Sequence, residues 1–434
     1  MGRMFLLAAV CIGVLHSTVS QACTSAIIPG WATPDGRPLL WKHRDTGTLE
    51  NSIGHFKGEI YSFVGLVNSD SPGGEVWIGS NTAGFSIMNT ASYCLKDDDV
   101  PAACMDREGV LMYRALEICA TLKDFEHFLD TLSRPMGVEA NFGCIDACGG
   151  AAYYEAGNYG YVKRDVAAME TGYCVVTNFS LSGRKEDWKG YERYLTADNI
   201  FGRMKGESRS FRRMSPHIIM DSLSRSYGHQ VLGIDLVRDS AAFLSSSRGV
   251  AVDQDFIPRR STSASVVVQG VRQGEDACRT VLWAALGYPS CAVMLPVPVS
   301  GEDHVPSCMK GEHSALCSLS LGIKEKWIFS LGSASNLGCY MDMRPVLAGS
   351  GGMPSLMSCS SYAEKVVGDA FLKLQSGLYE GRIAYRKYLK EYDRLAESLM
   401  DIVLRSYGGY IENARKSRSS LMSQSNFADL HKNP

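Results

Sequence analysis

The sequence has almost no net charge and, beyond its first 22 residues, no long apolar run. Its 44 Lys and Arg residues nearly balance 46 Asp and Glu residues, which gives a formal net charge of −2. A balanced chain gives no support for a nucleic acid or an anionic membrane surface as partner. No later stretch reaches the roughly 20 apolar residues that cross a bilayer. We therefore expect no membrane span after residue 22.

The sequence also lacks the motifs of nucleotide and metal sites. The run Gly79 to Gly84 has glycines at its ends, but no Lys-Ser or Lys-Thr pair and no helical pattern follow. We interpret it as a turn. Cys144 and Cys148 are close in sequence, yet no second Cys pair or spaced His pair accompanies them. A buried thiol or a local disulfide explains them better than zinc, and we expect neither a metal nor an organic cofactor.

What the chain does have is the pattern of an export signal at its start. Arg3 precedes an apolar run from Met4 to Val19, which is too short for a comfortable bilayer span. Ser20 and Ala22 put small residues at the two positions that a signal peptidase reads. We expect cleavage after Ala22 and export to the periplasm or out of the cell, where disulfides among the 14 cysteines are permitted.

Cleavage after Ala22 would make Cys23 the first residue of the mature protein. Cysteine is an intrinsically strong nucleophile. The α-amino group has a pKa of about 7.7–8.0 and can take up the thiol proton near neutral pH. We therefore predict that Cys23 is a nucleophile that carries its own base. The alternatives are a structural cysteine and a lipid-modified one, although Ser20 stands where a lipid-attachment motif has Leu or Val.

Turn signals and apolar periodicity predict an α+β fold. Strands are expected over residues 23–28, 39–45, 61–67, 142–147, 152–155, 173–178, 264–269 and 280–285, with a hairpin over 76–89. Helical spacing is found over residues 108–132 and 217–227. Pro289, Pro296 and Pro298 indicate an irregular connection. Strands, then a helical stretch, then more strands favour largely antiparallel sheets.

The end of the chain has a different pattern. Between about residues 361 and 413, apolar residues repeat at helical period and would line one face of two helices. Packing of this face against the main body is the expected arrangement. We predict three regions: a signal peptide at 1–22, a domain at 23–360 and a C-terminal helical extension at 361–434.

Several short motifs, taken in order, resemble the N-terminal-nucleophile (Ntn) hydrolases that cleave linear amides. This group contains penicillin V acylase, bile salt hydrolase and isopenicillin N acyltransferase. The resemblance covers roughly residues 23–295 and implies a four-layer αββα sandwich with the active site between its two sheets. The motifs are Cys23-Thr24-Ser25, Trp41-Lys42-His43-Arg44-Asp45, Gly79 to Asn89, Asn141 to Glu155, and Val176 to Phe179. Thr177-Asn178-Phe179 followed by Glu192-Arg193-Tyr194 is more similar to the acyltransferase branch.

The resemblance implies roles for residues at the matching places. Cys23 would be the nucleophile and Asp45 would hold its amine. Asn178 and Asn89 would stabilise the oxyanion, where each preorganised donor is worth about 3–4 kcal/mol of barrier. Arg260 resembles the late Arg that supports the nucleophile, with Arg259 beside it. Capping of turns and strand edges is the plain alternative for Asp45 and both asparagines.

The cations before Asp45 depart from part of the group. Bile salt hydrolases and penicillin V acylases have Arg three residues before the Asp, whereas this chain has Lys42 there and Arg44 nearby. Lys lacks the planar fork of Arg, which weakens the case for a bile-acid amide. Either cation could lower the pKa of the thiol. Because neighbouring strand residues point to opposite faces, His43 shares a face with Asp45 rather than with Lys42; a catalytic His43 is the weaker alternative.

We therefore expect an exported amidohydrolase or acyltransferase that acts on a small-molecule linear amide through a thioester. Two alternatives remain: a surface lipoprotein or other binding protein with Cys23 as its lipid anchor, and a non-catalytic descendant of the fold. The sequence leaves open which amide is cleaved, whether water or an amine accepts the acyl group, and whether the chain forms a homo-oligomer.

Overall fold

The computed structural model describes residues 22–96, 99–331 and 339–413. The predicted signal peptide therefore lies outside the described residues except for Ala22, and so does the end of the predicted extension. No helix within the described ranges is long and apolar enough to cross a membrane.

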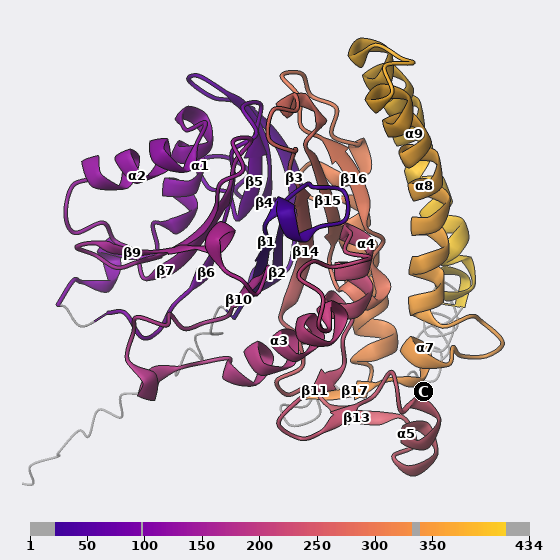
Figure 1. Ribbon diagram of the computed structural model, residues 1–434. Helices are drawn as coiled ribbons and strands as arrows, with labels where there is room; N and C mark the ends of the chain where they lie inside the picture. Colours follow the sequence, from indigo (N-terminus) through magenta and orange to yellow (C-terminus); the bar gives the residue numbers. More distant parts are fainter. Residues whose placement is uncertain (1–21, 97–98, 332–338, 414–434) are drawn as a thin grey trace, which may run out of the picture.

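Two antiparallel sheets form the centre of the molecule (Figure 1). The first has six strands in the order β10-β1-β2-β14-β15-β16. Their bounds are Cys174–Val176 for β10, Thr24–Ile28 for β1, Leu39–Asp45 for β2, Thr262–Gln269 for β14, Val281–Leu286 for β15 and Leu295–Pro298 for β16. The second sheet runs β3 to β9 in sequence order, so each strand pairs with the next along the chain.

Turns or loops join the successive strands of the second sheet, except between β6 and β7, where a long segment with two helices intervenes. Their bounds are Asn51–Lys57 for β3, Ser62–Asn68 for β4, Ile78–Asn81 for β5, Ser86–Ala91 for β6, Ala140–Ile145 for β7, Ala151–Ala156 for β8 and Tyr161–Asp165 for β9. The glycine-flanked run is the β5–β6 turn, in which Asn81 Oδ1 accepts hydrogen bonds from the backbone N–H groups of Ala83 and Phe85. The interpretation of this run as a turn is confirmed.

Helices cover the outer face of each sheet, which completes four layers (Figure 1). The helices α1 (Glu108–Ile118) and α2 (Leu122–Thr131) lie on the seven-stranded sheet. The six-stranded sheet is covered by α3 (Tyr191–Lys205), α4 (Pro216–Ile219) with the π-helical turn η5 (Met220–Ser224), and the hairpin of α8 (Leu356–Tyr379) and α9 (Tyr385–Ser406). The predicted α+β sandwich with antiparallel sheets is confirmed.

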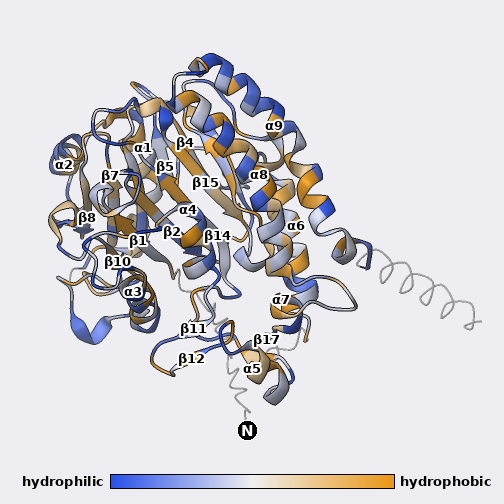
Figure 2. Ribbon diagram, turned by 45° about the vertical axis from the view of Figure 1, so that its right-hand side comes forward, coloured by the Kyte–Doolittle hydropathy of each residue, from blue (hydrophilic) through white to orange (hydrophobic). Residues whose placement is uncertain are grey.

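Smaller elements lie at the end of the sandwich near α3. They are α5 (Ser240–Ser246), α7 (Arg344–Leu347), and the two-stranded ribbons β11 (Gly228–His229) with β12 (Ile234–Asp235) and β13 (Val250–Val252) with β17 (Tyr340–Asp342). A further helix, α6 (Ala315–Ile323), continues into the π-helical turn η9 (Lys324–Ile328) and lies beside α8 (Figure 2). The segment between β13 and β14 carries Arg259 and Arg260.

The six-stranded sheet is buried on both faces, which explains its almost continuously apolar strands. Ile27 and Leu40 face the core between the sheets, whereas Trp41 and Trp283 face the helices on the other side. Phe371 of α8 packs edge-on against Trp283, with ring centroids 5.3 Å apart. Figure 2 shows the apolar strands inside and the polar outer side of α8 and α9.

Some elements differ from the sequence prediction. The helical stretch at 108–132 is two helices, because Thr121 caps α2: its Oγ1 accepts from Asp124 N–H while Asp124 Oδ2 accepts from Thr121 N–H. Strand β3 and helix α3 were not predicted. The irregular connection assigned to Pro296 and Pro298 is wrong, since both lie in β16. That strand is at the sheet edge, where a missing N–H donor is tolerated.

The cysteines form no disulfide with one another in the described part of the chain. Cys144 is buried in β7 and Cys148 is exposed in the loop that follows. No group of His, Cys, Asp and Glu within the described ranges has the arrangement of a metal site.

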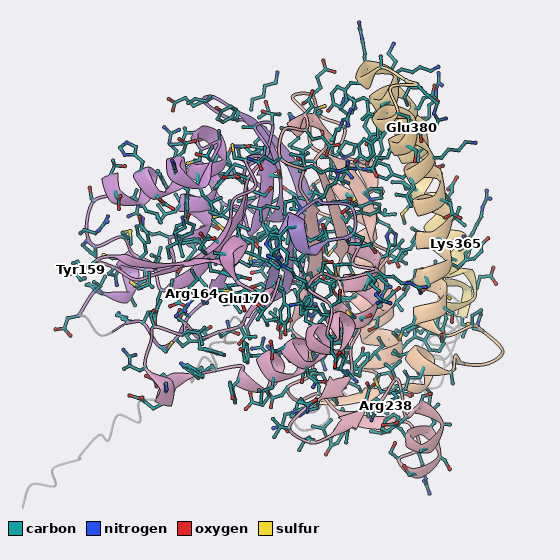
Figure 3. The ribbon with its side chains drawn as sticks, in the orientation of Figure 1. Tyr159, Arg164, Glu170, Arg238, Lys365 and Glu380 are labelled. Atoms are coloured by element: carbon teal, nitrogen blue, oxygen red, sulfur yellow. The ribbon has the colours of Figure 1, made fainter. Side chains whose placement is uncertain are left out.

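The C-terminal hairpin is tied to the body by a buried ion pair. Glu364 of α8 is 4% exposed and accepts hydrogen bonds from Arg225 Nη2 at 2.6 Å and Nη1 at 3.0 Å. Its Oε1 also accepts from Met294 N–H at 2.7 Å. The same helix carries an exposed pair, Lys365 with Asp369, on the side that faces away from the sheets (Figure 3).

We predict that Glu364→Gln lowers the free energy of unfolding by about 3 kcal/mol, because it removes the buried carboxylate of Arg225 and leaves that guanidinium with one carboxylate, the half-exposed Asp221, 2.7 Å from its Nη1. Denaturant unfolding monitored by circular dichroism gives this value. Asp369→Asn on the same helix is the matched control, and an exposed pair contributes at most about 1 kcal/mol. Equal losses in the two variants would show that the buried pair does not anchor the hairpin.

Candidate active site

Two adjacent strands place Cys23 beside Asp45. Cys23 immediately precedes β1 and Asp45 ends β2, and the antiparallel register pairs Thr24 with His43. Ala22 N–H donates to the carbonyl oxygen of Asp45 at 3.2 Å, which continues the ladder beyond β1. Both residues are buried, Cys23 to 5% exposure and Asp45 to 0%. The sequence thus folds its predicted nucleophile and carboxylate to the same end of two neighbouring strands inside the six-stranded sheet.

Alternation along these strands separates the neighbours into two groups. Ser25 Oγ contacts Tyr153 Oη of β8, so its face of β1 looks toward the seven-stranded sheet. Cys23 is two residues before Ser25 and therefore faces the same side of the strand. On β2, Lys42 and Arg44 also reach the opposite sheet. The thiol is therefore expected on the inter-sheet side with both cations.

Lys42 links the two sheets directly next to Cys23. Its Nζ donates to the backbone oxygen of Asn89 and, at 2.6 Å, to Asn89 Oδ1. Burial lowers the pKa of Lys42 to about 8, while the charges of Cys23 and of the buried Glu108 act in the opposite direction. Burial also raises the pKa of Glu108 to about 7. The Lys42 ammonium brings positive charge to the neighbourhood of Cys23 and holds Asn89 in place.

Arg44 has a different set of contacts. It donates to Asn51 Oδ1 and, through Nη2 at 2.8 Å, to Asn68 Oδ1. Its guanidinium carbon lies 4.6 Å from the centre of the Trp77 ring. Burial lowers the pKa of Arg44 to about 10, and the charge of Cys23 opposes this shift. Arg44 adds positive charge near the thiol, but its donors bind β3 and β4.

The carboxylate of Asp45 is held on both oxygens. Oδ1 accepts from Thr262 Oγ1 at 2.7 Å, and Oδ2 accepts from Arg259 Nη2 at 2.7 Å and Nε at 3.2 Å. Arg259 Nη2 also donates to the carbonyl oxygen of Ala22 at 3.3 Å. One guanidinium therefore binds the carboxylate and the peptide group that joins Ala22 to Cys23.

Asn178 reaches the same centre through Arg193. Arg193 Nη2 donates to Asn178 Oδ1 at 2.8 Å, while Nη1 donates to the Cys23 carbonyl oxygen at 2.7 Å and to Thr24 Oγ1 at 2.8 Å. Asn178 Nδ2 donates to the Ala91 carbonyl oxygen at 3.0 Å. Burial, together with the charge of Arg259, lowers the pKa of Arg193 to about 10. The structure thus brings Cys23, Asp45, Lys42, Asn89 and Asn178 into one neighbourhood.

Arg260 is not part of this cluster, so the expectation that its side chain supports Cys23 is corrected. Its Nη2 donates to Glu325 Oε2 at 2.7 Å, and its guanidinium lies over the ring of Phe329. The preceding residue, Arg259, turns inward instead. A tight turn fixes this choice, because Thr262 N–H donates to the Arg259 carbonyl and Arg259 N–H donates to Thr262 Oγ1.

Sequence reasoning missed the roles of Arg193 and Thr262. Arg193 lies on the buried side of α3, in line with Ala197, Ile200 and Phe201. An arginine on an otherwise apolar helical stripe was a readable signal, because a buried guanidinium needs partners. Thr262 gave no such signal, since a threonine that starts a strand is common.

His43 lies on the opposite face from Lys42. It is fully buried, with Nε2 3.2 Å from Thr262 Oγ1 and 3.7 Å from Asp45 Oδ1. Burial lowers its pKa to about 4; the charges of Arg259 and Arg193 add to this shift and Asp45 opposes it. His43 is therefore neutral at physiological pH and supports Asp45 from behind, an arrangement that does not favour a Cys–His pair.

Comparison with known proteins gives distant likenesses only. No protein-family model and no curated protein matches the sequence. Similar solved structures include a conjugated bile acid hydrolase from Clostridium perfringens, with 11% identity, a TM-score of 0.35, and coverage of 65% of this chain and 93% of that one.

Two further structures have the same degree of similarity. An N-acylethanolamine-hydrolyzing acid amidase ortholog from Caenorhabditis elegans has 15% identity, a TM-score of 0.35, and coverage of 56% of this chain and 92% of that one. Penicillin V acylase from Agrobacterium tumefaciens has 14% identity, a TM-score of 0.35, and coverage of 65% and 87%. These neighbours are enzymes of the kind that the motifs resemble, but TM-scores this low carry no argument about chemistry. The function is argued below from the residues of this chain.

The buried neutral His43 predicts a pH-dependent stability. Its folded pKa of about 4 lies below the ordinary value of 6.5, so the unfolded chain binds more protons between these values. His43 makes its full contribution to the free energy of unfolding above pH 6.5, and this contribution is lost as the pH falls toward 4. We expect His43→Gln to remove about 2–3 kcal/mol of the drop in unfolding free energy between pH 7 and 4.5. Parallel pH curves for the two proteins would contradict this.

Proposed function

We propose that this chain is an exported amidohydrolase or acyltransferase of linear amides, with Cys23 as an N-terminal nucleophile. The observation that carries the proposal is the position of Arg259. Its guanidinium binds both the Asp45 carboxylate and the carbonyl of the Ala22–Cys23 peptide group. Cleavage at that peptide would leave the new α-amino group within reach of a buried carboxylate that can accept further hydrogen bonds.

The amine and the thiol of Cys23 then act together. The α-amino nitrogen takes the thiol proton, and the thiolate sulfur attacks the carbonyl carbon of the substrate amide. A C–S bond forms and the carbonyl oxygen becomes an oxyanion. The α-ammonium group next gives its proton to the amide nitrogen as the C–N bond breaks, which releases an amine and leaves a thioester. Water or a second amine attacks the thioester and frees the thiol.

The surrounding residues supply charge and position. Lys42 and Arg44 lie on the inter-sheet side with Cys23 and supply positive charge there. Asn178, held by Arg193, and Asn89, held by Lys42, are the proposed oxyanion donors. Both asparagines are fixed before the reaction, and preorganised donors of this kind stabilise the developing charge without reorganisation. Asp45 and Arg259 orient the amine rather than react.

The proposed function first requires that the signal peptide is cleaved immediately before Cys23. When the full chain is expressed in a bacterial host that exports it, we expect the intact mass of the mature protein to begin at Cys23, and we expect a reagent specific for amines to modify its α-amino group. A diacylglycerol adduct on Cys23 would support the lipoprotein alternative instead. If the mature chain retained Ala22, the nitrogen of Cys23 would be a peptide nitrogen and could not act as the base of the proposed reaction.

The second prediction concerns the nucleophile. Cys23→Ala should lower kcat/KM by about a thousandfold or more in a screen of N-acylated amino acids and bile conjugates, because the sulfur that attacks the amide carbonyl is lost. Its thermal unfolding should stay close to that of the parent. Cys148→Ala is the matched control, since Cys148 is exposed and far along the chain from the cluster. Full activity of Cys23→Ala would end the proposal.

The third prediction uses two neighbouring arginines. Arg259→Lys should lower kcat/KM by about ten- to a hundredfold, because Lys cannot bind Asp45 through two nitrogens and still reach the position of the Ala22 carbonyl. Arg260→Lys, one residue away, should change kcat/KM by less than about twofold, since its side chain pairs with Glu325 at the surface. A large loss of kcat/KM in Arg260→Lys with little loss in Arg259→Lys would show that Arg260 is the residue that supports the nucleophile.

A further inference from the structure

A cavity of about 490 Å³ lies on the outer side of the six-stranded sheet, where α3 and α4 cover it (Figure 1). Its lining comes from the end of α3, the segment 211–214, α4 and the π-helical turn η5. The volume falls within the range of about 300–1,000 Å³ that is usual for small-molecule sites. Lys42 and Asn89 meet on the other side of this sheet, so the cavity is separate from the candidate centre.

The floor of the cavity is apolar and continuous with the core behind the sheet. Phe211 and Met214 are 3% and 4% exposed and belong to that core, and Met204 and Ile218 pack against it. The floor is held in place, because Phe211 N–H donates to the Ala32 carbonyl oxygen at 2.8 Å. Methionine side chains adapt to ligands of different shape. The apolar body of a ligand therefore fits this floor.

Two arginines form the charged part of the lining. Arg212 and Arg213 are both exposed, and none of the described residues that line the cavity is acidic. Neither guanidinium forms a hydrogen bond, an ion pair or a ring contact with another residue in the described part of the chain. The buried guanidinium groups of Arg193, Arg225 and Arg259, by contrast, are bound to amide or carboxylate oxygens. Arg212 and Arg213 are thus available for an oxyanion, which a guanidinium binds through two parallel N–H donors.

The chain around the cavity keeps this charge positive. Residues 203–213 contain five cations and one acid, Glu207, and none of the six forms an ion pair within the described ranges. The five cations are Arg203, Lys205, Arg209, Arg212 and Arg213. Asp221, next to the lining residue Ser222, is already paired with Arg225 at 2.7 Å. An anion is therefore attracted to this cavity and a cation is repelled.

We propose that this cavity is a second binding site, for a small amphiphilic anion that has an oxyanion head group on an apolar body. Arg212 and Arg213 bind the head group, and the body lies against Met204, Phe211 and Met214. Aliphatic and aryl carboxylic acids are the simplest ligands of this class. The inference is independent of the proposed function, because none of the cavity's lining residues belongs to the candidate centre.

Calorimetric titration of the mature protein tests the head group and the apolar body separately. Octanoate has both, octylamine has the same chain with a positive charge, and acetate has the head group alone. We expect octanoate to bind about tenfold or more tightly than either, because charge-assisted hydrogen bonds and apolar burial both contribute. Equal affinities for octanoate and octylamine, or for octanoate and acetate, would overturn the proposal.

Variants of the lining locate the ligand. The double variant Arg212→Gln/Arg213→Gln should bind octanoate about tenfold or more weakly. Arg203→Gln/Arg209→Gln is the matched control: it removes the same charge from outside the lining and should change the affinity by less than about twofold. Equal weakening by the two double variants would overturn the site, since octanoate would then respond to net charge alone.

Ser222→Phe tests the cavity itself, because the ring would fill it while both arginines remain. We expect octanoate binding to be lost, and thermal unfolding close to that of the parent to show that the variant is folded. Full octanoate binding by folded Ser222→Phe would contradict the proposal.

Two further measurements separate this site from other places where an amphiphile binds. Cys23→Ala should bind octanoate as the parent does, whereas loss of binding in that variant would assign the ligand to the candidate centre and overturn the inference. Sedimentation with phosphatidylglycerol vesicles tests a membrane surface as the partner. Vesicle binding that Arg212→Gln/Arg213→Gln abolishes, in a protein that does not bind octanoate, would assign the arginines to a lipid surface and overturn the proposal.

Discussion

The candidate centre depends on one buried charge pair, the carboxylate of Asp45 with the guanidinium of Arg259. A carboxylate with no solvent contact is stable as an anion only when its oxygens are bound, and here Arg259 and Thr262 bind both. The pair also fixes the geometry of the chain before Cys23, because the same guanidinium binds the Ala22 carbonyl. The residues that lead into β1, Cys23 among them, are thereby aligned with the end of β2.

Around this pair, the structure concentrates positive charge near Cys23. Lys42, Arg44 and Arg193 are all buried, and burial lowers the pKa of each. Cations are kept in such surroundings only if acceptors surround them. Asparagine oxygens serve this purpose: Asn89 for Lys42, Asn51 and Asn68 for Arg44, and Asn178 for Arg193. Two of these asparagines are thus fixed by the same contacts that make the site electropositive.

The C-terminal helices are part of the sandwich rather than an appendage. The α8–α9 hairpin supplies the outer layer of the six-stranded sheet, and Phe371 and Tyr392 belong to its apolar core. The buried pair of Arg225 and Glu364 fixes the hairpin to the segment around Met294. This layer covers the back of the strands that carry Lys42 and Asp45, so it supports the site from the side opposite the seven-stranded sheet.

The sequence by itself determined most strands of the first half of the chain, although not β3 or β9, together with the antiparallel α+β class and the positions of Cys23, Lys42 and Asp45. These follow from local patterns: alternation fixes which side a strand residue faces, and turn residues fix where a strand ends. Only the tertiary structure decided which of Arg259 and Arg260 turns inward, because the choice depends on a turn closed by Thr262. The same holds for Arg193, which reaches Cys23 across 170 residues of sequence. Contacts between distant segments depend on how the layers pack, and no local pattern records them.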